Sequence, residues 1–142
     1  MNDLTLRKAK IIIRKALEKG KELGFKPLSV AMLDAGGHLI AFERGDGAAP
    51  GRVAIATGKA HGAVMLGMVG RAQMARAEQQ AYFMQAVNGA FQGQVVPVPG
   101  GVLIRDARQN IVGAVGVTGD LSDNDEICAI AGVEATNLTA EA

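Results

Sequence analysis

Residues 101–118 read GVLIRDARQNIVGAVGVT. Two runs rich in valine and isoleucine, 101–105 and 111–118, flank a polar turn, and this pattern is typical of a β-hairpin. Upstream, residues 28–44 (LSVAMLDAGGHLIAFER) repeat the arrangement around the turn Asp34-Ala35-Gly36-Gly37. Two hairpins predict a mainly antiparallel sheet rather than one built from serial βαβ units.

Four helical stretches surround the hairpins. Residues 5–23 place apolar side chains at i, i+3 and i+4 and end before Gly24 and Pro27. Residues 52–68 are rich in alanine, and their two glycines, Gly58 and Gly62, predict close packing against a neighbour. The other two stretches are 71–87 and 122–138, the last with Ser122 as its N-cap, while prolines make 95–98 an edge or a loop. The sequence predicts one α/β domain over 1–142, with its antiparallel sheet flanked by helices.

Composition excludes several functional classes. The formal net charge is +1, aromatic residues make up 4% of the chain and tryptophan is absent, so neither a phosphate-binding basic excess nor stacking rings for nucleic acid are present. The single cysteine excludes an intramolecular disulfide and fits a reducing compartment. No secretory h-region or membrane-length apolar run occurs, so we expect a cytoplasmic protein with no membrane or nucleic-acid partner.

Charge is distributed unevenly along the chain. Residues 1–26 carry eight basic and three acidic groups, whereas residues 119–142 carry six acidic groups and no basic one. Two solvated helix faces explain this pattern, and complementary docking between subunits of a homo-oligomer is the alternative.

Three charged residues are candidates for chemistry. Arg44 and Asp46 lie at the start of and within the loop that precedes the 52–68 helix, and Lys59 lies about two turns into that helix. A guanidinium, a carboxylate and an amine in one pocket over the 113–119 strand would suit a small carboxylate ligand, with Arg44 as its clamp and Lys59 or Asp46 as the proton-transfer group. A surface salt-bridge cluster is the alternative interpretation.

Glycines and a threonine form the second candidate set. Gly100, Gly101, Gly116 and Thr118 belong to a strand pair that is nearly devoid of bulky side chains. This pair predicts either a floor for a flat ligand or tight packing of a helix. The turn glycines Gly36 and Gly37 either close a hairpin or leave backbone N–H groups accessible to a ligand.

The two histidines, His38 and His61, are the candidate metal ligands. His61 is expected on a helix among alanines and glycines, where a packing role is the alternative to haem or metal ligation. Common nucleotide, hydrolase and zinc-protease motifs are absent.

An ordered set of motifs resembles the GlcG/HbpS family, which includes the C-terminal domain of PduO-type proteins. The motifs are Asp34-x-Gly36-Gly37, Arg44-x-Asp46-Gly47-Ala48, Lys59-Ala60, Pro99-Gly100-Gly101, Gly113-Ala114-x-Gly116-Val117-Thr118-Gly119 and Asp125-Glu126-x-x-Ala129-x-Ala131-Gly132. The resemblance implies profilin-like α/β/α layers, assembly into dimers or larger rings, and binding or degradation of haem or another tetrapyrrole in some relatives, while others accompany small-acid catabolism.

Two functional hypotheses follow. In the first, the chain binds haem or another tetrapyrrole, with Arg44 or Lys59 on the propionates and His61, His38 or Met65 near the iron. In the second, it is a small-molecule enzyme acting on a hydroxy or keto carboxylate through Arg44, Lys59 and Asp46.

Overall fold

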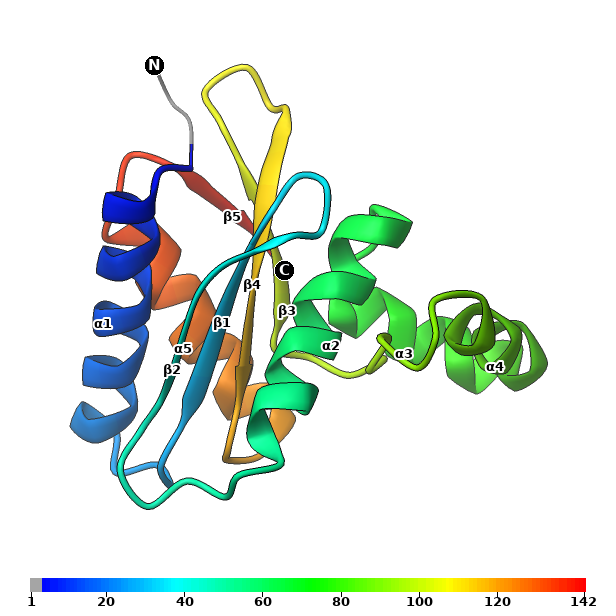
Figure 1. The fold of residues 1–142 in the computed structure, drawn as a ribbon, viewed down its shortest axis with the longest axis horizontal. Helices are drawn as coiled ribbons and strands as arrows, with labels where there is room; N and C mark the ends of the chain where they lie inside the picture. The colour runs from blue at the N-terminus through cyan, green and yellow to red at the C-terminus, as the bar shows by residue number, and fades with distance from the viewer. Residues whose placement is uncertain (1–3) are drawn as a thin grey trace.

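The computed structural model describes residues 4–142 and contains one five-stranded sheet in the order β2-β1-β4-β3-β5 (Figure 1). All neighbouring strands are antiparallel. The strands are β1 (Ser29–Asp34), β2 (Leu39–Arg44), β3 (Gly101–Arg105), β4 (Ile111–Thr118) and β5 (Thr139–Glu141). The helices are α1 (Leu6–Glu22), α2 (Arg52–Leu66), α3 (Gly70–Gln79), α4 (Ala81–Ala90) and α5 (Ser122–Glu134). The predicted fold class is confirmed.

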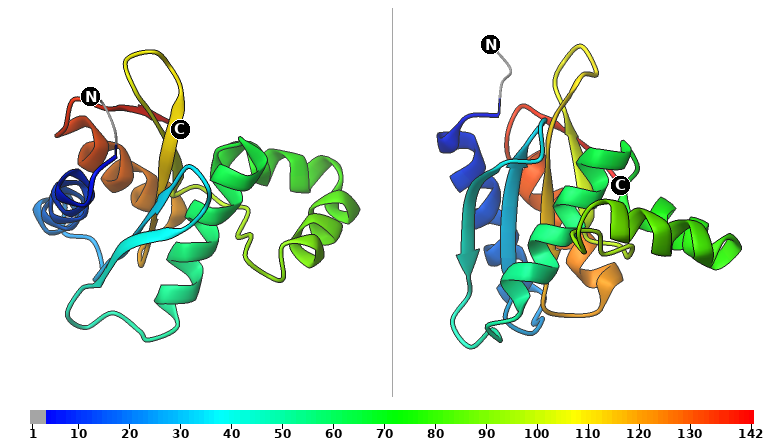
Figure 2. Two further views of the ribbon diagram at one scale, coloured as in Figure 1. Left: turned by 45° about the horizontal axis from the view of Figure 1, so that its top comes forward. Right: turned by 45° about the vertical axis from the view of Figure 1, so that its right-hand side comes forward.

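Helices cover both faces of the sheet. Helices α1 and α5 lie on one face, α2 lies on the other, and α3 and α4 project from the body beyond α2 (Figures 1 and 2). Alternation along β1 matches this division, because Val30 and Met32 belong to the core under α1 and α5 while Ala31 and Leu33 pack with α2. Side chains two residues apart on a strand therefore share a face.

Helix α1 forms where the spacing predicts it. The Thr5 side chain accepts a hydrogen bond from the Lys8 N–H at 3.2 Å and caps the helix. Its buried stripe includes Ile12 and Ile13, and Gly132 of α5 approaches the Ile12 backbone closely. The basic N-terminal helix and the acidic C-terminal helix thus pack together within one chain.

Both hairpins close with the same side-chain device. The Asp34 carboxylate accepts from the N–H groups of Gly36 and His38, each at 2.9 Å. The Asp106 carboxylate accepts from the N–H groups of Arg108 and Asn110, also at 2.9 Å. Each aspartate replaces backbone partners that the turn lacks, and both predicted turns are confirmed.

Three sequence expectations need correction. The predicted 71–87 helix is two helices, because Gln80 adopts φ −142° and ψ 71° between α3 and α4. Ser122 is the first residue of α5 rather than its N-cap, a position that Leu121 takes with no side-chain hydrogen bond. Helix α5 ends at Glu134, and the chain then adds β5 to the edge of the sheet beside β3, a strand that the sequence analysis did not predict.

Within residues 4–142, no single helix has the length and apolar character needed to cross a membrane. Helices α2 and α3 reach that length and apolar character only when taken together, and the chain bends by 80° between them.

Candidate functional site

Helix α2 lies directly on the small-residue strands. A Cβ at Gly116 would press on the Ala56 carbonyl oxygen, and one at Gly101 would press on the Lys59 carbonyl oxygen. On its other side, a Cβ at Gly58 would lie 2.7 Å from a Val96 methyl group. The helical glycines therefore permit close packing, as predicted. Of the two alternatives, tight packing of a helix is therefore the one that holds at Gly101 and Gly116, where α2 backbone occupies the space that a flat ligand would need.

Lys59 reaches through this packing to a buried carboxylate. Its Nζ lies 3.1 Å from Asp125 Oδ2 and donates to the Val117 carbonyl oxygen at 2.9 Å. The other Asp125 oxygen accepts from the Asp120 N–H at 2.9 Å. Lys59 is 2% exposed and Asp125 is 1% exposed, so the ion pair lies away from water.

Burial governs the ionisation of this pair. Desolvation lowers the pKa of Lys59 below 10.5, although Asp125 opposes the shift. Desolvation likewise raises the pKa of Asp125 above 3.8, opposed by Lys59 and by the Asp120 N–H. The nearby Cys128 thiol is also buried, which raises its pKa to about 11. The structure thus holds Lys59 buried against two oxygen acceptors, Asp125 Oδ2 and the Val117 carbonyl oxygen.

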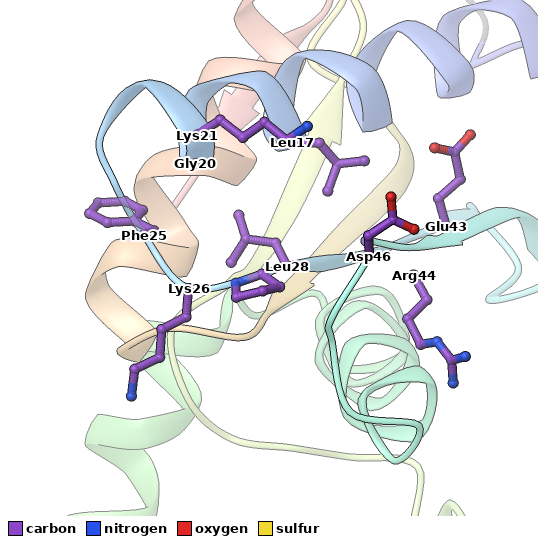
Figure 3. A pocket seen from close by; sticks show the side chains of 11 residues that line it. Leu17, Gly20, Lys21, Phe25, Lys26, Leu28, Glu43, Arg44 and Asp46 are labelled. Carbon is purple, nitrogen blue, oxygen red and sulfur yellow. The ribbon is translucent and has the colours of Figure 1, made fainter.

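Arg44 and Asp46 line a surface pocket of about 380 Å³ between the end of α1 and the end of β2. Leu17 and Leu28 project into this pocket, whereas the Arg44 guanidinium extends away from it (Figure 3). Lys59 does not line the pocket, so the predicted grouping of Arg44, Asp46 and Lys59 is not formed. The residues that line the pocket are Leu17, Gly20, Lys21, Phe25, Lys26, Pro27, Leu28, Glu43, Arg44, Gly45 and Asp46.

Arg52, which the sequence analysis did not select, lies beside Thr118. Its Nη1 donates to Thr118 Oγ1 at 2.7 Å, and its positive charge contributes to the lowered pKa of Lys59. Thr118 is 1% exposed at the end of β4. Helix α2 therefore brings Arg52, rather than Lys59, to the Thr118 side chain.

A second group of candidate residues gathers at the opposite end of the sheet. The Gly36 and Gly37 turn folds over α2, where a Cβ at Gly37 would lie 2.6 Å from Met65 Cε and 3.6 Å from His61 Nε2. Gly37 has φ +83°, so glycine suits this position in conformation as well as in space. Three residues that the sequence analysis considered, Gly37, His61 and Met65, are thus brought together.

The half-buried His61 ring has a defined orientation. Its Nδ1 lies 2.9 Å from the Gln94 carbonyl oxygen, which can only accept a hydrogen bond, so Nδ1 carries the proton in this contact. The Phe91 ring packs edge-on at a centroid distance of 5.9 Å. Within residues 4–142, Nε2 makes no hydrogen bond. Phe91 and Gln94 follow α4, and no sequence motif indicates their proximity to His61.

His38 does not join this group through a hydrogen bond of its ring. The exposed imidazole lies over Gly36, where a Cβ would be 3.0 Å from the ring. No group of three or more metal-ligating side chains occurs in the part of the chain that the structure describes.

Comparison with known proteins assigns the family. The model of the haem degrading protein HbpS-like family matches residues 4–134. The chain belongs to the HbpS-like family. Among curated proteins, no match is found.

Solved structures share the HbpS-like fold. A double mutant of HbpS from Streptomyces reticuli is 31% identical, with a TM-score of 0.76 over 95% of this chain and 88% of that one. A PduOC–haem complex has a TM-score of 0.84 at 23% identity over 96% of each chain. The ORFY protein of Klebsiella pneumoniae has a TM-score of 0.81 at 23% identity, over 94% of this chain and 90% of that one. The last two likenesses concern the fold alone.

Proposed function

We propose that this HbpS-like chain binds haem and that His61 Nε2 is its iron ligand. The observation that carries the proposal is the contact between His61 Nδ1 and the Gln94 carbonyl oxygen. A histidine that ligates a metal commonly donates its other ring N–H to such a carbonyl, which fixes the tautomer and makes Nε2 the stronger ligand. Membership of a family described as haem degrading supports the choice of haem.

The surroundings of His61 fit an iron porphyrin in composition. Phe91 supplies an aromatic edge and Met65 a thioether, which is a known haem ligand and an adaptable apolar contact. Bound haem would supply a redox-active iron centre, and Gln94 and Phe91 would orient the His61 ring that holds the iron. The proposal concerns binding, because haem degradation also requires an electron donor and dioxygen that these residues do not specify.

Replacing His61 by alanine should remove the Soret shift that added haemin produces in the parent protein, or weaken haem binding at least tenfold. The matched control is His38→Ala, which removes the other, exposed histidine and should leave the spectrum unchanged. Both variants are titrated with haemin after circular dichroism has verified their folding. Added imidazole should restore the parent spectrum to His61→Ala by filling the same position. An unchanged spectrum in His61→Ala contradicts the assignment.

The carboxylate-enzyme alternative has less support. Lys59 Nζ already contacts Asp125 and Val117, and the structure does not bring it to Asp46. A cytoplasmic location stays a prediction from the sequence.

We also propose that the chain forms a homo-oligomer through its projecting α3–α4 arm. The arm stands away from the sheet (Figure 2), and its Tyr82 is 70% exposed. Arg76 lies 4.2 Å from the centre of the Phe83 ring, which ties α3 to α4 and gives the arm a defined shape. Its proposed occupant is a second copy of this chain, because most soluble oligomers are symmetric homo-oligomers and the arm offers the same exposed aromatic, Tyr82, on every copy.

Sedimentation at micromolar concentration should give a mass of at least two chains. Tyr82→Asp should lower that mass by placing a charge in the apolar contact, whereas Arg108→Ala, in the distant β3–β4 turn, should not. A parent protein that sediments strictly as a monomer contradicts the proposal.

A further inference from the structure

One cluster of polar groups at the end of the sheet includes neither the proposed iron ligand, His61, nor the buried Lys59–Asp125 ion pair. It consists of Arg44, Ser29, Thr118 and Arg52, and its geometry follows from strand register. Ser29 pairs with Arg44 on one side and with Thr118 on the other. Residues paired across antiparallel strands project to the same face, so these three side chains form a row.

The row lies on the face that α2 covers. Ser29 is two residues from Ala31, which packs with α2, and therefore shares its face. Arg52, in the first turn of α2, donates to Thr118 Oγ1 at 2.7 Å. The Arg44 side chain leaves β2 on the side away from the α1 pocket (Figure 3). Strand register thus places Arg44 and Thr118 on either side of Ser29, and Arg52 approaches Thr118 from α2.

Positive charge at this position is not neutralised. In residues 4–142, neither Arg44 nor Arg52 has an ion-pair partner within 4.0 Å. The N-terminus of α2 adds further uncompensated positive charge. Its N-cap is Gly51, which has no side chain to cap the helix, and its first turn has no acidic residue. The positive end of the helix dipole favours an anion at this end. Among the described residues, the buried carboxylate is Asp125, and it is already paired with Lys59.

Ser29 supplies an independent observation. The residue is 0% exposed, and its Oγ has no hydrogen-bond partner. A buried hydroxyl without a partner costs free energy, so its retention between Arg44 and Thr118 indicates a ligand oxygen that it serves.

We propose that Arg44, Ser29, Thr118 and Arg52 form a binding site for a carboxylate group. Guanidinium groups bind carboxylates through two parallel hydrogen bonds, and the hydroxyls of Ser29 and Thr118 complete the set of donors. The carboxylate belongs to a small free acid or to the side arm of a larger ligand such as a haem propionate. The site does not depend on His61, which lies towards the other end of α2.

Calorimetric titration with pyruvate tests the free-acid form. The parent protein should bind pyruvate, and Arg44→Ala and Arg52→Ala should each weaken binding by about 10- to 100-fold, as expected for a lost charge-assisted hydrogen bond. Arg52→Lys should bind pyruvate with an affinity between those of the parent and Arg52→Ala, because it keeps the charge and loses the planar fork. Arg108→Ala, which removes a positive charge elsewhere, is the matched control and should bind like the parent.

The variant Ser29→Ala distinguishes a ligand-binding role of the Ser29 hydroxyl from a purely structural one. If the hydroxyl serves a ligand, the variant should be more thermally stable without ligand, since an unsatisfied buried group is removed, and should bind pyruvate several-fold more weakly. Equal binding of pyruvate by Ser29→Ala and the parent would overturn the role of Ser29 in the site.

Haemin and its dimethyl ester test the propionate form. If the carboxylate is a propionate, haemin should bind more tightly than its ester, and Arg52→Ala should abolish the difference. His61→Ala should leave pyruvate binding intact, so failure of the haem proposal is distinguishable from failure of this one. The site is overturned if pyruvate does not bind and haemin and its ester bind equally.

Discussion

Replacing Gly116 by alanine should lower the free energy of unfolding by about 3 kcal/mol, the upper part of the usual range for overpacking a core. The added Cβ would press on the Ala56 carbonyl oxygen and lie 2.9 Å from the Ala60 nitrogen. Both atoms are helix backbone, so no side-chain rotation relieves the contact and α2 has to move off β4. Urea denaturation of the parent and the variant measures the difference.

Gly89→Ala is the matched control. Gly89 lies inside α4, and a Cβ there meets nothing within 4 Å. The same substitution should therefore stabilise the protein by about 0.5–1 kcal/mol through the helix propensity of alanine. A Gly116→Ala protein as stable as the parent would show that α2 is not seated on β4 as described.

The Gly116 contact illustrates what sequence reasoning can supply. Small residues on a strand predict either a helix packed closely or a flat ligand, and only the position of α2 decides between them. Local chemistry was more informative for the hairpins, because Asp34 and Asp106 each satisfy their own turn within four residues. Features fixed within one turn of chain are therefore predictable from sequence.

Features fixed by distant residues were missed. Neither glycine nor proline marks the break at Gln80, although the Arg76 side chain bonds to Gln80 Oε1 at 2.9 Å and stacks on Phe83 across the break. Strand β5 is three residues long and is defined by pairing with β3. Its sequence carries too little periodicity to predict a strand.

The candidate site shows the same division. The residue types Arg44, Lys59, Thr118 and His61 were recognised as chemically useful, but their grouping was not. Lys59 faces Asp125 across 66 positions of sequence, and Arg52 reaches Thr118 across the same separation. Neither pairing has a local signal, although Asp125 belongs to the motif set that resembles the family.

The buried ion pair carries the second large prediction. Lys59→Met should lower the free energy of unfolding by about 3–5 kcal/mol at neutral pH, because the Asp125 carboxylate then stays buried without its counter-charge. Methionine fills most of the space of the lysine stem, so loss of packing contributes little. The double variant Lys59→Met/Asp125→Asn should recover much of the loss, since asparagine is neutral and its side-chain oxygen can still accept from the Asp120 N–H.

The pH dependence of the single variant identifies the cause. Burial raises the pKa of Asp125 above its ordinary value of 3.8, and removal of Lys59 raises it further. A carboxyl group with a raised pKa in the folded state stabilises that state at pH values below 3.8, and this contribution is lost as pH rises through the folded pKa. The deficit of Lys59→Met relative to the parent should therefore shrink as pH falls through the pKa of Asp125, whereas Lys59→Met/Asp125→Asn should show no such change. A deficit that is constant with pH, or a double variant no more stable than Lys59→Met, would attribute the loss to packing rather than to the unpaired charge.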